Sequence, residues 1–456
     1  MVSWISALLL AVTFCMVYIL TEAADIKSDP VHSVIQDISH AITNLARDLS
    51  IQLANGGSKC DIISPVSIGS SLLLLMRIAT GGTRAELLKL LHLDRYSRND
   101  QKIPQNFRHL ITELLEQTAE RDINSDDIPT WLEDKQCGPT DYEDYEYEGS
   151  PDANGEELTN MVRLANAIFV QNGFLNNTVL EEKVRTLFLS IIENVDFYDA
   201  PENVTEHINK WANSSTNGRI SQIISDPLSR DTTMVIANAL YFKAYWEEVF
   251  IEGGTRPRKF FPNGENDESV EADIMAHSGC FPYYSSASLD ARIMGFPYKN
   301  RTTTMYVILP NNSNRKKLQQ LVSKVDAHTL DQLIRNMTMR TASVFFPKMH
   351  ITNSFDLKAV LEQMGVSAMF RRGTNDFSSM NKASKEATRS LRVSGVMHKV
   401  DLEVNEAGTE GGAVTVTLQD RMAPAVNFRV LTPFLVAIRH DITKLLLFYG
   451  PVYDPS

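Results

Sequence analysis

Cysteine is scarce in this chain of 456 residues, which contains only four. Cys15 lies in an N-terminal segment that we expect to be removed, so Cys60, Cys137 and Cys280 remain. Three thiols allow at most one internal disulfide, with Cys60–Cys137 as good a pair as any other, and they leave one cysteine over. A network of disulfides is therefore excluded, and a large apolar core must hold the fold together.

The motifs of common enzyme active sites are also missing. There is no G-x-S-x-G elbow, no H-E-x-x-H, no C-x-x-C pair and no phosphate-binding glycine loop. His277 and Cys280 have a spacing that a metal could use, but two ligands are too few, and a loop or core role explains them better. We predict no enzyme activity, no metal and no cofactor.

Basic clusters are rare as well. Arg315-Lys316-Lys317 could touch a polyanion, but a solvated helix face explains it better. We expect no nucleic-acid partner.

Long hydrophobic runs are confined to the N-terminus, where Leu8 to Leu20 is apolar and ends in Thr-Glu-Ala-Ala. This pattern predicts a signal peptide over residues 1–23. A membrane anchor is the alternative, but no Lys or Arg precedes the run and it is short for a span. We expect a secreted, extracellular glycoprotein without a membrane partner. Asn-X-Ser/Thr sequons stand at Asn176, Asn203, Asn213, Asn300, Asn311 and Asn336.

Negative charge is concentrated in one stretch. Residues 122–157 hold thirteen Asp or Glu against the single Lys135, while the whole chain has a formal net charge of −12. This predicts an acidic surface insertion over about residues 121–157, too polar to pack. It could speed association with a basic partner, fold back on its own domain, or remain solvated. Tyr142, Tyr145 and Tyr147 lie among its carboxylates, a setting in which secreted chains are sulfated.

Helical and strand patterns are mixed along the rest of the chain. Apolar spacing predicts helices over 34–53, 67–91, 106–119, 180–193 and 205–213, with Thr80-Gly81-Gly82 as a break after which Thr83 caps a new helix. β-branched and aromatic runs predict strands over 161–170, 234–242, 303–309, 343–346 and 445–450. The irregular order predicts one α+β domain over residues 24–456.

Residues 405–424, NEAGTEGGAVTVTLQDRMAP, combine a loop-like start with a strand-like middle. This stretch and eight others resemble blocks of the serpin family of protease inhibitors, in the usual order. The other blocks include SPVSIGSSLLLL (64–75), ATGGTRAELLKLLHL (79–93), RLANAIFVQ (163–171), INKWANSSTNGRI (208–220), ANALYFKAYWEEVF (237–250), FPYKNRTTTMYVILP (296–310), FPKMHITNSFDLKAVLEQMGVSAMF (346–370) and VMHKVDLEVNEAGTE (396–410).

The resemblance implies a serpin fold of three β-sheets and eight to nine helices, with an exposed reactive-centre loop at about residues 405–427. It implies that an extracellular serine protease cleaves this loop, forms an acyl-enzyme, and is trapped in a covalent complex while the loop inserts into the central five-stranded sheet. The inhibitor is expected to be a monomer before that complex forms. A non-inhibitory serpin, acting as carrier, storage protein or chaperone, is the alternative.

Side chains of an inserted strand alternate between the two faces of the sheet. Thr409, Gly411, Ala413, Thr415 and Thr417 are all small and uncharged, so we assign this set to the core face. The opposite set is Glu410, Gly412, Val414, Val416 and Leu418. The resemblance places the hinge at Glu406, Gly408 and the residues from Thr409 to Thr415.

The bond offered to the protease lies at Arg421-Met422 or at Met422-Ala423. The family's usual count from Glu406 gives cleavage after Met422, which would suit elastase-like or chymotrypsin-like enzymes. Cleavage after Arg421 would suit trypsin-like enzymes, whose specificity pocket holds a buried Asp. We favour Arg421 and leave both open.

The resemblance also marks residues that support insertion. Ser64, Ser67, Asn238 and His398 match positions beneath the central strands, where the sheet must part. Trp246, Lys399 and Glu406 match the upper end of the sheet, where insertion starts. Satisfied core polar groups without a gating role are the alternative.

Overall fold

The computed structural model describes residues 30–54, 57–98, 101–116, 129–132, 137, 161–251, 253–299, 301–381, 391–409 and 424–456. The expected signal peptide, the three tyrosines of the acidic insertion, Asn300 and residues 410–423 lie outside these ranges. Among the described helices, none combines the length and apolarity that a bilayer span requires.

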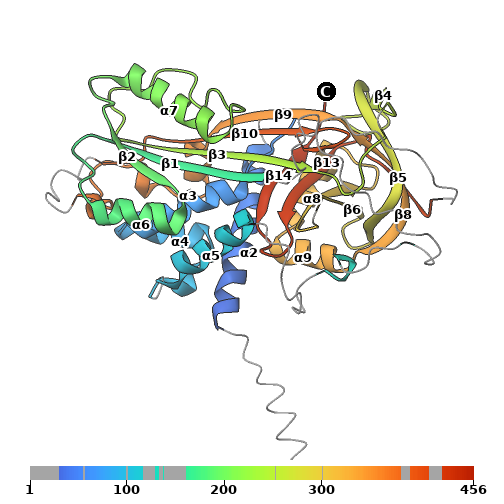
Figure 1. Ribbon diagram of the computed structural model, residues 1–456, viewed down its shortest axis with the longest axis horizontal. Coiled ribbons are helices and arrows are strands. Elements are labelled where there is room, and N and C mark those ends of the chain that lie inside the picture. The colour runs from blue at the N-terminus through green and yellow to red at the C-terminus, as the bar shows by residue number, and fades with distance from the viewer. Residues whose placement is uncertain are drawn as a thin grey trace, which may run out of the picture.

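Most of the described α-helices gather on one side of a sheet, while α7 lies alone on the other side (Figure 1). In chain order the helices are α2 (Pro30–Leu53), α3 (Pro65–Ile78), α4 (Gly81–Leu90), α5 (Lys102–Glu116), α6 (Thr178–Phe188), α7 (Pro201–Ser215), α8 (Arg315–Lys324), α9 (Ala327–Arg335) and α10 (Lys358–Gln363). Short 3-10 helices are η2 (Asp94–Tyr96), η3 (Thr130–Leu132), η4 (Ala368–Phe370) and η5 (Ser378–Met380).

The first sheet has the strand order β2-β1-β3-β10-β9, with the short β11 paired to β3. Its strands are β1 (Met161–Gln171), β2 (Ile191–Val195), β3 (Met234–Tyr245), β9 (Met349–Asp356), β10 (Gly395–Val404) and β11 (Gly408–Thr409). The five long strands match the central sheet expected from the resemblance. β3 and β10 are adjacent and parallel.

The second sheet has the order β12-β8-β5-β6-β7-β13-β14, with β4 paired to β5. Its strands are β4 (Arg256–Phe260), β5 (Val270–Ser286), β6 (Ala291–Pro297), β7 (Thr303–Pro310), β8 (Thr338–Pro347), β12 (Val426–Arg429), β13 (Phe434–His440) and β14 (Leu446–Val452). The α+β class is confirmed. Where three sheets were expected, the described residues form two hydrogen-bonded arrays, because the long β5 pairs with β8 along most of its length and with β6 at its end.

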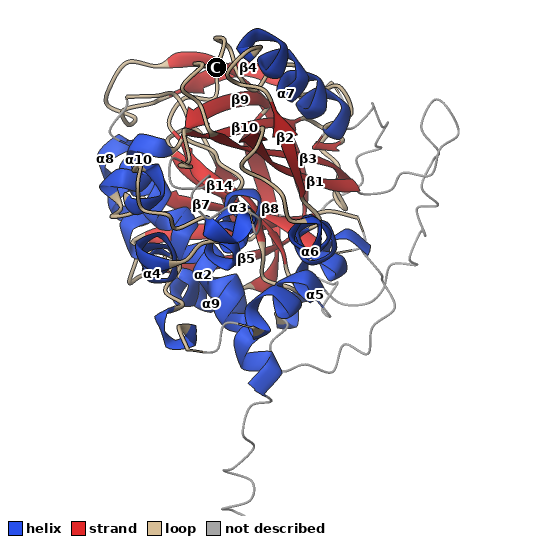
Figure 2. Ribbon diagram, turned by 90° about the vertical axis from the view of Figure 1, so that its left-hand side faces the viewer, coloured by secondary structure: helices blue, strands red, loops and turns tan. Residues whose placement is uncertain are grey.

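The largest core lies between the first sheet, the second sheet and α2 to α6 (Figure 2). It takes the apolar face of α2, including Ile38, Ile42 and Leu45, and one face of β3, including Ile236 and Leu240. A smaller cluster lies on the opposite face of the first sheet, where α7 covers Ala237 and Ala239. The middle of the first sheet is therefore covered on both faces.

Two local predictions are wrong. The helix expected to run to residue 193 ends at Phe188, because Leu189 turns to φ 49° and residues 191–195 join β1 as strand β2. Thr83 does not cap α4 but lies inside it, and Thr80 stands at the N-cap. The free N–H of Thr83 donates to Asp376 Oδ2 at 2.8 Å, so a carboxylate from a distant segment takes the place of the local cap.

The disulfide is not Cys60–Cys137, the pair that the sequence analysis named as one possibility. Cys137 is bonded to Cys280 across a separation of 143 residues, with their Cα atoms 5.8 Å apart. Cys60 is the remaining free cysteine of the described residues and is buried. Burial raises the pKa of its thiol to about 11, so it stays protonated and unreactive. Cys280 and His277 accordingly share no metal site, and His277 Nε2 lies 3.2 Å from Glu248 Oε2.

Candidate functional site

The seam between β3 and β10 is the place where a new strand could enter the first sheet. The two strands pair in parallel from Val235/Gly395 to Leu240/Val400 and then separate toward the hinge. The next neighbours, β1 and β9, are antiparallel to them. A strand running opposite to β3 and β10 can therefore pair with both of them in antiparallel geometry.

Residues 408–409, which the resemblance assigns to the start of the reactive loop, pair with β3 beside this seam. After β10 the chain turns at residues 405–407, and β11 then pairs antiparallel with β3, with Gly408 opposite Tyr245 and Thr409 opposite Ala244. Asn405 holds the turn, because its N–H donates to Gly408 O at 2.9 Å and its Oδ1 accepts from the N–H groups of Ala407 and Gly408. Glycine is required at 408, since a Cβ there would lie 2.7 Å from Tyr245 Cα.

Trp246 fixes the hinge from the side of β3. Its backbone N–H donates to Ala407 O and its Nε1 donates to Asn405 O, both at 2.9 Å. The indole is fully buried and stacks on Tyr298 at 4.4 Å between ring centroids. Tyr298 Oη lies 2.8 Å from Thr409 Oγ1, and burial raises the pKa of Tyr298 well above its usual value. The hydroxyl therefore remains a neutral hydrogen-bonding partner of the hinge.

Glu406 is tied to the second sheet instead of pointing along the loop. Thr255 Oγ1 donates to Glu406 Oε1 at 2.5 Å, and Lys348 Nζ donates to Oε2 at 3.0 Å. Partial burial acts to raise the pKa of the Glu406 carboxyl, but these hydrogen bonds outweigh it and the pKa is lowered. The carboxylate is ionised at neutral pH, and it anchors the start of the loop.

The polar residues beneath the seam are fully buried. Their hydrogen bonds form separate pairs and not one connected network. Ser64 N donates to His398 Nε2 at 3.0 Å, and His398 stands opposite Asn238 in the β3–β10 ladder. Ser67 Oγ donates to Asn166 Oδ1 at 2.7 Å, while Ser71 Oγ donates to Asn238 Oδ1.

Several polar atoms in this region have no partner among the described protein atoms. They are Ser64 Oγ, Asn166 Nδ2, Asn238 Nδ2 and His398 Nδ1. Burial lowers the pKa of His398 to about 3, so its ring is neutral at physiological pH. The seam thus holds spare buried donors that another strand could satisfy.

Lys399 lies on the outer face, away from Trp246 and Glu406. Its Nζ donates to Gln222 O at 2.7 Å, in the segment that returns from α7 to β3. Arg219 of the same return segment pairs with Glu403 of β10 at 3.2 Å. These contacts fasten the return segment, residues 216–228, to β10.

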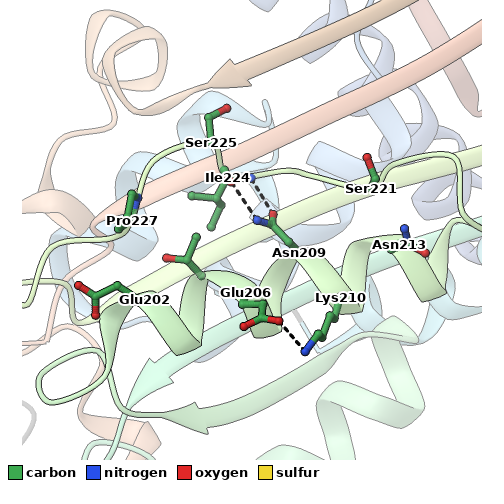
Figure 3. A pocket seen from close by; sticks show the side chains of 10 residues that line it. Glu202, Glu206, Asn209, Lys210, Asn213, Ser221, Ile224, Ser225 and Pro227 are labelled. Carbon is green, nitrogen blue, oxygen red and sulfur yellow. Dashed lines mark hydrogen bonds and ion pairs between the residues drawn. The ribbon is translucent and has the colours of Figure 1, made fainter.

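The return segment is also fastened to α7 (Figure 3). Asn209 Oδ1 accepts from the N–H groups of Ile223 and Ile224, and Asn209 Nδ2 donates to Ile224 O at 3.0 Å. A shallow groove of about 460 Å³ remains between the helix and the segment. The outer face of β3 is therefore covered by two elements that are held together as one layer.

The far end of the loop is attached to the second sheet. Ala425 N donates to Thr341 Oγ1 at 3.2 Å, and β12 then pairs in parallel with β8 from Val426/Ala342 onward. Both ends of the loop are thus placed, whereas Arg421, Met422, Ala423 and hinge residues Glu410 to Thr415 lie outside the described residues.

Comparison with known proteins agrees with this arrangement. The family described as "Serpin (serine protease inhibitor)" matches residues 40–455. The chain belongs to the serpin family. Serine protease inhibitor 28Dc of Drosophila melanogaster is 34% identical over 92% of this chain and 79% of its own length. Leukocyte elastase inhibitor of Xenopus laevis is 27% identical over 92% of this chain and all of its own.

Solved serpin structures confirm the fold. Human thyroxine-binding globulin superposes with a TM-score of 0.74 at 20% identity, over 93% of this chain and 100% of that one.

The serpin resemblance did not identify every residue at the seam. Asn166 and Ser71 carry hydrogen bonds there, and Asn209 joins α7 to the return segment, yet each is an ordinary polar residue in a helix or strand pattern. Tyr298, which meets Thr409, lies more than one hundred residues away from it in sequence. No local sequence signal identifies Tyr298 as a partner of Thr409, because the two residues are brought together only by folding.

The sequons of this serpin differ in their surroundings. Asn176, Asn203 and Asn336 are exposed, while Asn213 and Asn311 are half-buried. Asn311 Nδ2 donates to Asp290 Oδ1 at 2.9 Å. Asn213 lies at the groove beside α7 (Figure 3).

Proposed function

We propose that this serpin is a secreted inhibitor of a trypsin-like serine protease, which it traps by loop cleavage and insertion of the cleaved loop between β3 and β10. The observation that carries the proposal is the β11–β3 ladder, because it fixes the register in which the loop would continue. Each further loop residue would pair with the preceding residue of β3, starting with Glu410 opposite Lys243.

This register supports the assignment of the two loop faces. Gly411, Ala413, Thr415 and Thr417 would lie opposite Phe242, Leu240, Asn238 and Ile236, all of which are buried on the core side of β3. Cross-strand partners share a face. The small, uncharged set therefore enters the core, and Thr415 brings a hydroxyl to the region of Asn238 where buried amide donors lack partners.

The opposite set would lie beneath the α7 layer. Val414, Val416 and Leu418 would face Ala239, Ala237 and Val235 of β3, which pack under α7. Val414 and Val416 would thus each lie opposite a small alanine side chain, which leaves room for them. The glycines at 411 and 412 cost about 0.5 to 1 kcal/mol each in a strand, but their β3 partners would be the bulky Phe242 and Tyr241.

The energy of insertion is sufficient to drive trapping. An inserted strand makes ladder bonds on both sides, on the order of ten more than the present β3–β10 ladder, at roughly 1 kcal/mol net each. The stability of an ordinary domain is about 5 to 15 kcal/mol. Insertion can therefore supply enough free energy to distort a protease that is covalently attached to the loop.

Secretion is supported by three features. They are the N-terminal apolar run, the sequons, and the Cys137–Cys280 disulfide, which oxidising compartments favour. Sulfation of Tyr142, Tyr145 and Tyr147 stays a prediction, as does the monomeric state.

The test begins with the full-length protein, expressed with its N-terminal segment and purified from the medium. We expect a complex with trypsin that survives SDS, and a released C-terminal peptide that begins at Met422 when measured by mass spectrometry. A peptide that begins at Ala423, with a complex formed by elastase, would assign Met422 instead of Arg421. Clean cleavage without a covalent product, for every protease tried, would rule out inhibition.

That last outcome would favour the non-inhibitory alternative. Its support is the fold shared with thyroxine-binding globulin, a serpin solved with thyroxine bound. At 21% identity this likeness concerns the fold, and the described hinge geometry gives the inhibitor the stronger case.

A further inference from the structure

The acidic insertion touches the rest of the serpin at two described places, and we call these together the insertion brace: η3, residues 130–132, and Cys137. In η3, Trp131 is 1% exposed and meets Tyr306 edge-on at 6.3 Å between ring centroids. Cys137 is bonded to Cys280 of β5. A buried indole and a covalent bond, both within this acidic stretch of the sequence, therefore join it to the rest of the protein.

The first contact leads to the hinge through Arg301. The Arg301 side chain is 12% exposed, and its Nη1 donates to Leu132 O at 3.1 Å. Its Nε pairs with Glu247 Oε2 at 2.9 Å. Glu247 directly follows Trp246, whose backbone and indole hold the hinge carbonyls.

The backbone of Arg301 supports a specific role. Its N–H donates to Tyr298 O at 2.9 Å, and its φ is 52°, a left-handed conformation that Asn or Gly adopts with less strain. The guanidinium explains why arginine stands at such a position. It links η3 to Glu247, which follows the end of β3 where Trp246 holds the hinge.

The second contact leads to the far end of the loop. Cys280 stands opposite Thr341 in the β5–β8 ladder. Thr341 Oγ1 accepts from Ala425 N, the last contact before β12 begins. The disulfide therefore reinforces β5 next to the strand that carries the C-terminal end of the reactive loop.

We propose that the insertion brace is a positioning element that holds both ends of the reactive loop in place before a protease arrives. Trp131 and Arg301 restrain the hinge end, and the Cys137–Cys280 disulfide restrains the β12 end. This role rests on the proposed function, because a fixed loop matters for an inhibitor that must present it.

The test is amide hydrogen exchange on the intact full-length protein, without protease. In Arg301→Asn, which suits the left-handed backbone, we expect exchange at residues 405–409 to accelerate at least tenfold. In Cys137→Ser/Cys280→Ser we expect the same acceleration at residues 425–429, and in Trp131→Ala mainly at the hinge end. Asp290→Asn is the matched control, since Asp290 is also left-handed with φ 48° but contacts Asn311 and Lys317 instead of the loop ends.

Exchange that is unchanged at both loop ends in all three variants would overturn the proposal. Uniform acceleration that includes β13 and β14 would overturn it as well, since that pattern reports global destabilisation. Complex formation with trypsin is measured on the same wild-type sample. If the wild type forms no complex with trypsin while the variants show the local exchange pattern, inhibition of trypsin is rejected and the structural role of the brace stands.

Discussion

At the scale of single residues, His398 makes the stability of the folded protein depend on pH. It is fully buried between the sheet and α3, accepts from Ser64 N, and has its pKa lowered to about 3 by burial. An exposed histidine titrates near pH 6.5. Between these values the unfolded chain carries a proton on His398 that the folded protein does not, so the folded state loses stability as the pH falls.

We expect His398→Gln to flatten this part of the pH dependence. The wild type should lose about 1.4 kcal/mol of stability per pH unit from this residue as the pH falls from 6.5 toward 3. Thermal melting of both proteins at pH 7.5, 6.5, 5.5 and 4.5 measures the difference, and other titrating groups cancel in the comparison. Identical pH slopes for the two proteins would contradict the role of His398.

At the scale of elements, the inserted loop must place its residues on the correct faces of the sheet. Ala413 would lie opposite Leu240, which is 1% exposed on the core side of β3. An arginine there would bring a charge into the core, at a cost of several kcal/mol. That cost is a large fraction of the free energy that insertion supplies.

We expect Ala413→Arg to turn the inhibitor into a substrate, with the SDS-stable trypsin complex reduced more than tenfold and cleavage retained. Glu410→Arg is the matched control, because residue 410 would lie on the outer face opposite Lys243, which is only half-buried, so that a long side chain can reach water. Equal loss of complex in both variants, as judged on gels, would reject the facing assignment.

At the scale of the whole molecule, the intact serpin is expected to stop short of its most stable state. The parallel pair β3 and β10 leaves room for a better-bonded sheet, and the uncut loop is held at both ends, by β11 and by Ala425. Cleavage frees one end.

We therefore expect the loop-cleaved protein to melt about 10 °C or more above the intact protein, given on the order of 10 kcal/mol of added stability in a chain of this size. Calorimetry before and after limited proteolysis at residues 421–423 gives the answer. A cleaved form that melts no higher would mean that no free energy is stored.

Much of this architecture follows from the order of residues alone. The helices α2, α5 and α7 and the strands β1, β3 and β7 begin and end close to the patterned segments, because alternation and helical spacing are local properties. The serpin resemblance was also recognised from sequence, since its blocks are contiguous stretches such as residues 396–410. Contiguous signals of this kind need no knowledge of the fold.

The remaining features depend on residues that meet only after folding. Cys137 reaches Cys280 across 143 residues, Thr409 meets Tyr298, and Arg301 joins η3 to Glu247. Asp376 satisfies the start of α4 from the far side of the chain, which no local cap signal could have indicated. The sequence by itself determined the family and many of the helices and strands, because these depend on patterns among neighbouring residues. Only the tertiary structure decided which cysteines pair and what holds the two ends of the loop, because those partners are brought together by packing of the core.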